Sequence, residues 1–167
     1  MSEHTNDTPW EPPFSGTEAE HLLGALDRLR WTFRWKADGL DARGLATRLG
    51  PSTLTLGGLL KHLAAQEDYA ILVKTDGEEM PAEWAANGWD GGDDWEFSSA
   101  ADDSPAELYA RYDAAVDRAR TRLAARLADR GLDQQVALAE KLGKEVSLRR
   151  IVCDSPRSTA GTPARPT

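Results

Sequence analysis

The sequence is poor in the residues that form disulfides, metal clusters and membrane spans. Of its 167 residues, one is cysteine and three are histidine. A single cysteine, Cys153, cannot form a disulfide within the chain and is typical of a reducing compartment. No apolar run approaches the roughly 20 residues that a membrane-spanning helix needs, and no secretory signal pattern opens the chain. These absences predict a cytoplasmic protein without a membrane partner.

Positive charge is also scarce. The chain has 20 lysines and arginines against 28 aspartates and glutamates, which gives a net charge of −8. Such a chain repels phosphate backbones, so we expect no nucleic-acid partner. Its length suits one domain with a single core.

The composition changes twice along the chain. We expect an extended, proline-rich lead-in over residues 1–14, with Trp10 and Phe14 packing onto the domain. A helical bundle follows over residues 15–154. Residues 155–167 are rich in Pro, Ser, Thr and Arg without periodicity, which predicts a disordered tail.

Hydrophobic periodicity predicts an all-α bundle. The first helix begins at a capping box formed by Thr17 and Glu20. A later long helix begins at a second capping box, Ser104 with Glu107, and ends at Gly131.

The central helix is predicted over residues 55–73, with Thr55 as its N-cap. Gly57 and Gly58 each weaken its first turn by roughly 1 kcal/mol relative to alanine. In return, they allow a neighbouring backbone to approach closely. The buried stripe of this helix comprises Leu56, Leu59, Leu60, Leu63 and Ile71.

His62 lies on the shoulder of that stripe, in line with Gln66 and Tyr69. A lone histidine is weak support for a metal site. It is either a ligand facing a cleft or a histidine that is hydrogen-bonded to a neighbour or half exposed. Spacing within the helix does not separate these alternatives.

A long connection follows over residues 75–103. Loops of this length are either functional or disordered, and Trp84, Trp89 and Trp95 argue against disorder. We interpret the segment as a lid over one end of the bundle, or as a loop whose tryptophans fill gaps. The expected pocket-lining residues are Gln66, Tyr69, Glu67, Trp84, Trp89 and Trp95.

The fourth helix begins after Ser147 and is expected to end after about two turns, because Pro156 follows. A bundle whose fourth helix is this short leaves an apolar groove open. We therefore predict dye binding at the groove or a homodimer that covers it.

Three stretches of the chain resemble the DinB-like (DinB/YfiT) superfamily of metalloenzymes. They are W-E-P-P-F-S-G-T-E, L-T-L-G-G-L-L-K-H-L-A-A-Q-E-D-Y and S-L-R-R-I-V-C-D, in this order, and they span residues 10–154. The branch is similar to mycothiol-dependent maleylpyruvate isomerase. The resemblance implies an up-down-down-up four-helix bundle with a long crossover loop.

The resemblance also implies a divalent metal, zinc or nickel, held by three side chains. His62 matches the histidine of the second helix, and the other two ligands come from an E-x-x-x-H or H-x-x-x-H pattern on the fourth helix. Two ligands one turn apart share a helix face, and open metal positions remain for a thiolate. The implied reaction is S-transfer or isomerisation that uses a low-molecular-weight thiol and a small electrophile.

The sequence departs from this pattern after Asp154. No histidine follows His62, and nothing downstream supplies E-x-x-x-H. With codons chosen among those permitted for residues 157–167, a shifted frame encodes E-Y-G-R-H-A-G-Q-A-D. This favours a frameshift near codons 154–156 over a native disordered tail, and resequencing the coding DNA separates the two.

Two functional hypotheses remain. The first is a metal-dependent thiol S-transferase or isomerase that uses His62 and is impaired by two missing ligands. Glu67 then lies beside the pocket, and Asp68 is expected on the surface of an amphipathic helix. The second is a metal-free helical bundle acting as a binding or structural module, or a decayed gene product. Metal content separates them.

Overall fold

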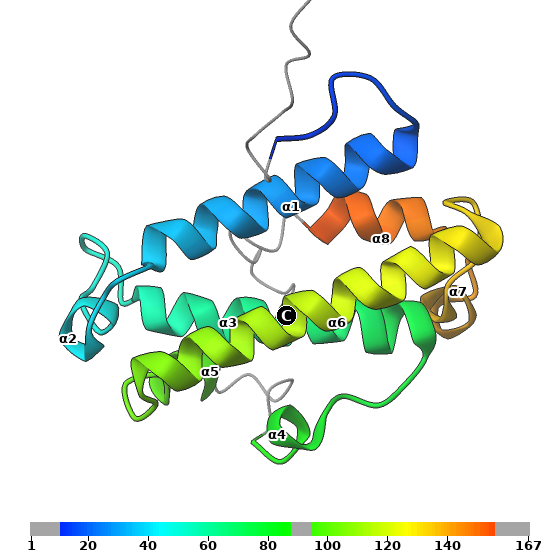
Figure 1. Ribbon diagram of the computed structural model, residues 1–167. Helices are drawn as coiled ribbons and strands as arrows, with labels where there is room; N and C mark the ends of the chain where they lie inside the picture. Colours follow the sequence, from blue (N-terminus) through cyan, green and yellow to red (C-terminus); the bar gives the residue numbers. More distant parts are fainter. Residues whose placement is uncertain (1–10, 88–94, 156–167) are drawn as a thin grey trace, which may run out of the picture.

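The computed structural model describes residues 11–87 and 95–155, and these are mostly helical. In this part of the chain there is no β-strand, only isolated bridges. The prediction of an all-α fold is therefore confirmed. The elements (Figure 1) are α1 (Glu18–Ala37), α2 (Ala42–Leu45), α3 (Leu56–Asp68), the π-helix η1 (Tyr69–Asp76), α4 (Ala82–Ala85), α5 (Trp95–Ser98), α6 (Pro105–Arg130), α7 (Ala137–Leu142) and α8 (Leu148–Asp154). None of the described helices is long and apolar enough to cross a membrane.

Both predicted capping boxes are present. The Thr17 hydroxyl accepts a hydrogen bond from the Glu20 amide, and the Glu20 carboxylate accepts one from the Thr17 amide. Ser104 and Glu107 make the same reciprocal pair at the start of α6. Each box satisfies free first-turn donors within three residues, so these helix starts depend on local sequence alone.

The glycine pair at the start of α3 lets two other elements come close, as expected. A Cβ added to Gly57 would lie 3.3 Å from the backbone oxygen of Leu45, which is in α2. A Cβ added to Gly58 would lie 2.9 Å from Cδ1 of Phe97, which is in α5. Helix α3 also makes its most extensive contact with α6 (Figure 1), so it is the centre of the fold.

The chain leaves the α-helical path after Asp68. We predicted one helix over residues 55–73, whereas α3 continues as the π-helix η1. The Thr75 hydroxyl donates to the carbonyl oxygen of Ala70, five residues earlier, at 2.8 Å. Ile71 is buried in the core, whereas Ala70 and Lys74 line a cavity. The wider turn thus changes which side chains face inward.

The connection after η1 is an integral part of the core in its described portion. Trp84 of α4 has 0% exposure and meets Trp95 of α5 in a T-shaped arrangement with ring centroids 6.1 Å apart. These two tryptophans fill space against α3, which agrees with the gap-filling alternative. Trp89 lies outside the described residues.

The C-terminal part contains an unexpected helix. Helix α7 lies between α6 and α8, in a stretch for which the sequence analysis predicted no helix, and it ends at Gly143, which has a φ of 60°. Helix α8 begins after Ser147 as expected, although the Ser147 side chain makes no capping hydrogen bond. Figure 1 shows α8 beside α1, and it also contacts η1.

The described end of the lead-in contacts α1 through its prolines. A Cβ on Gly24 would lie 3.0 Å from Cα of Pro12, so the lead-in approaches α1 closely there. The expectation that Phe14 packs onto the bundle is wrong, because its side chain is 86% exposed. Trp10 and the segment after Ser155 lie outside the described residues.

Candidate functional site

A cavity of about 480 Å³ lies between α1, α3, η1, α7 and α8. Its volume is within the range of small-molecule sites, about 300–1,000 Å³. Leu29 and Phe33 of α1 line it, and Leu29 remains 43% exposed. The cavity lies beside α8, where the short fourth helix predicted an apolar groove.

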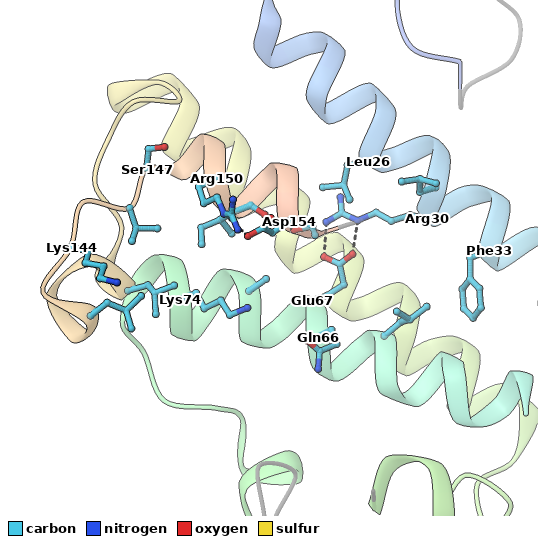
Figure 2. A pocket seen from close by; sticks show the side chains of 18 of the residues that line it. Leu26, Arg30, Phe33, Gln66, Glu67, Lys74, Lys144, Ser147, Arg150 and Asp154 are labelled. Carbon is cyan, nitrogen blue, oxygen red and sulfur yellow. Dashed lines mark hydrogen bonds and ion pairs between the residues drawn. The ribbon is translucent and has the colours of Figure 1, made fainter. Parts of the chain in front are cut away.

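An ion pair joins α1 to α3 at the wall of this cavity (Figure 2). Arg30 has 5% exposure, and its Nε and Nη2 donate to the two carboxylate oxygens of Glu67 at 2.7 and 2.6 Å. A third bond runs from Arg30 Nη1 to Asp27, at 3.0 Å. Burial lowers the pKa of Arg30, but the bonds to Glu67 and Asp27 outweigh it and leave the pKa raised. Glu67 therefore neutralises Arg30 and is not a free base.

His62 and Glu96 form a buried pair on the α5 side of α3. Their exposures are 8% and 5%, and His62 Nδ1 lies 2.9 Å from Glu96 Oε1. The Phe97 ring stacks on the imidazole, with centroids 4.8 Å apart. The sequence alternative of a histidine bonded to a neighbour agrees with this arrangement.

The carboxylate of Glu96 determines the tautomer of His62. Burial raises the pKa of Glu96, but the hydrogen bond from His62 and nearby positive charge outweigh burial and leave the pKa lowered. An ionised carboxylate only accepts, so His62 Nδ1 is the donor of this bond, and in the neutral imidazole Nε2 is the nitrogen that carries the lone pair. Among the described residues, Glu96 Oε2 is a buried side-chain oxygen that has no hydrogen-bond partner.

Asp68 is a core residue, and its predicted surface position is wrong. Its exposure is 0%. Arg118 of α6 donates to its two oxygens at 3.0 and 2.9 Å, and Trp84 Nε1 donates to Oδ2 at 2.9 Å. Burial of this charge is tolerated because a guanidinium and an indole saturate it.

The structure separates the residues that the sequence suggested would line one pocket. Gln66 and Glu67 line the cavity. Tyr69 begins η1, with the Lys74 ammonium 4.7 Å from its ring centroid. Trp84 and Trp95 lie in the core by α4 and α5, and Trp89 lies outside the described residues. The roles of these residues remain predictions.

Glu96, the hydrogen-bond partner of His62, was not predicted as a site residue. Glu96 lies in a four-residue helix that follows a segment without periodicity, so no helical spacing relates it to α3. A buried carboxylate opposite a histidine that lies 34 residues away becomes visible only in three dimensions.

The described side chains do not complete a metal site. Among residues 11–87 and 95–155, no group of three or more His, Cys, Asp or Glu side chains could hold a metal ion. His62 has one neighbouring carboxylate, that of Glu96. The three-ligand set implied by the DinB-like resemblance is therefore not assembled by these residues.

The family model described as mycothiol-S-transferase matches residues 21–160. The chain belongs to the mycothiol S-transferase family. This confirms the DinB-like resemblance and associates the chain with mycothiol-related thiol chemistry. No curated protein and no solved structure matches the chain. Within the mycothiol S-transferase match lie α3 with His62, the cavity and α8.

Proposed function

We propose that this member of the mycothiol S-transferase family is a mycothiol-type thiol S-transferase or isomerase in which His62 activates the thiol. The observation that carries the proposal is the buried His62–Glu96 pair, in which the carboxylate is bonded to Nδ1 and Nε2 is the other ring nitrogen. His62 also stands where the DinB-like resemblance places the functional histidine of the second helix.

The pair suits proton transfer from a thiol. His62 Nε2 accepts the S–H proton, and the resulting thiolate forms a carbon–sulfur bond with a small electrophile. In S-transfer, the leaving group departs with the electron pair of the bond that breaks. The Glu96 carboxylate stabilises the imidazolium that forms and holds the ring in place. Carboxylates have this role in the Ser-His-Asp triad. Gln66, one turn from His62 on α3, lines the cavity, whereas His62 is not among its lining residues.

We further propose that metal-dependent catalysis is impaired in this chain. A bound zinc or nickel ion would lower the pKa of the thiol. The described residues supply His62 but no complete ligand set, so the steps above involve only the side chains of this chain. The proposal places the reaction in the cytoplasm, where low-molecular-weight thiols are reduced.

Replacing His62 by alanine is expected to lower the S-transfer rate by about 10²–10⁴-fold, the usual contribution of a general base. Glu96→Gln keeps the side-chain size and is expected to lower kcat by about tenfold. The measurement is the initial rate of conjugation of purified mycothiol to monochlorobimane, with far-UV circular dichroism to verify folding. His21→Ala is the matched control, because His21 is exposed and its ring is hydrogen-bonded to the backbone carbonyl of Pro13. Equal rates for the wild type and His62→Ala would refute the assignment.

Metal content tests the impairment separately. After dialysis against zinc or nickel and removal of free metal, we expect substoichiometric metal by mass spectrometry and little change in the conjugation rate. The reason is that a single imidazole binds these ions weakly without further ligands. One ion per chain that is lost in His62→Ala would disprove impairment while leaving the thiol reaction in place.

A second candidate function is a metal-free binding module. The cavity of about 480 Å³ favours it, since a cavity of this volume can hold a small ligand without any chemistry. Ligand binding in a protein that shows no mycothiol conjugation, with or without metal, would select this candidate.

A further inference from the structure

Among the described residues, the cavity wall contains a half-buried cation that makes no ion pair. Lys74 of η1 is half-buried and lines the cavity, and it makes no ion pair with the described residues. Its ammonium lies over the ring of Tyr69, 4.7 Å from the centroid. Burial lowers the pKa of Lys74, and the more distant charge of Asp154 partly opposes this. Figure 2 shows Lys74 reaching from η1 among the lining residues.

Two other cations of the described wall have carboxylate partners. Arg30 pairs with Glu67 at 2.6 Å. On α8, Arg150 pairs with Asp154, also at 2.6 Å. Lys144 and Glu145 are of opposite sign and lie at the exposed rim. Lys74 is thus the half-buried lysine of the described wall whose charge remains available to a ligand.

Much of the remaining wall is apolar. The apolar side chains that contribute to it include Leu26, Leu29, Phe33, Leu63 and Ile151. An ammonium group in such surroundings has lost part of its hydration, and an anion placed beside it restores favourable interactions. Sites of this volume commonly combine an apolar body with a few polar groups that orient the ligand.

We propose that this cavity binds a small molecule with an apolar body and a carboxylate, and that Lys74 Nζ binds the carboxylate. The site goes beyond the proposed S-transfer, because it depends on η1 and α8 rather than on the His62–Glu96 pair. Binding is measured without turnover, so failure of either proposal leaves the other testable.

Titration calorimetry of the full chain with octanoate and octan-1-ol tests the assignment. Both probes have the same apolar body, and only octanoate has a charge. We expect octanoate to bind about tenfold or more tightly than octan-1-ol, because bonds to charged partners are the stronger ones. Lys74→Met should abolish that difference and leave octan-1-ol binding unchanged. Lys141→Met is the control, because Lys141 is exposed on α7 and does not line the cavity.

A second variant has an effect of opposite sign. Asp154→Asn removes the carboxylate whose negative charge acts on Lys74 and pairs with Arg150. Both cations are then left to attract the ligand carboxylate, so octanoate should bind several-fold more tightly. Equal affinities for octanoate and octan-1-ol, or an unchanged preference in Lys74→Met, would overturn the proposal. Absence of any octanoate binding would also overturn it.

Discussion

Replacing Trp84 by alanine is expected to lower the free energy of unfolding by about 3–5 kcal/mol, the usual range for a buried tryptophan. The indole has 0% exposure and packs edge-on against Trp95. It also donates to Asp68, which is fully buried. The substitution therefore creates a cavity and removes one of the bonds that compensate a buried charge. Denaturant unfolding followed by far-UV circular dichroism measures the loss.

Two further variants separate the causes. Trp84→Phe keeps an aromatic ring and removes only the N–H donor, so it should be less destabilising than alanine, because Arg118 still bonds Asp68 Oδ2 at 2.9 Å. Trp35→Ala is the matched control, since Trp35 is 60% exposed and its loss should change the free energy of unfolding by about 0.5 kcal/mol. Equal losses for Trp84→Ala and Trp35→Ala would contradict the core position of Trp84.

Replacing Glu67 by alanine is expected to lower the free energy of unfolding by about 3–5 kcal/mol, because it leaves a buried guanidinium partly uncompensated. Arg30 has 5% exposure and donates two of its hydrogen bonds to Glu67, so Asp27 is the side-chain acceptor that remains for it among the described residues. Arg30 cannot relieve this by losing its proton, because a guanidinium stays protonated in proteins. The same denaturant titration provides the measurement.

The double variant Arg30→Met with Glu67→Leu is the decisive comparison. Replacing both charges by apolar side chains removes the desolvation penalty together with the attraction, so the double variant should be close to the wild type in stability. Asp129→Ala, which removes an exposed ion pair with Arg130, is the control and should cost about 0–1 kcal/mol. A double variant as unstable as Glu67→Ala would show that the packing of these side chains matters more than their charge.

The features that the sequence predicted correctly are local ones. The start of α1 depends on Thr17 and Glu20, and that of α6 on Ser104 and Glu107, each pair three residues apart. The close approach at Gly57 and Gly58 follows from the absence of a side chain. The capping contacts close over three residues and cost little chain entropy, whereas the glycine pair leaves room for Leu45 and Phe97, which lie farther away in the sequence.

The candidate site was only partly predictable. His62 was identified from its position on α3 and from the family resemblance, and the family is confirmed by the match over residues 21–160. Its partner Glu96 was missed. The π-helix after Asp68 was also missed, and it is this segment that supplies Ala70 and Lys74 to the cavity.

By itself, the sequence determined the all-α class, the helix starts and the mycothiol S-transferase family. Only the tertiary structure decided which charges are buried and what they meet. Glu67 and Asp68 are adjacent in sequence, yet one meets Arg30, 37 residues earlier, and the other meets Arg118, 50 residues later. The physical reason is that burial of a charge depends on long-range neighbours that desolvate and neutralise it, and helical periodicity gives no information about them.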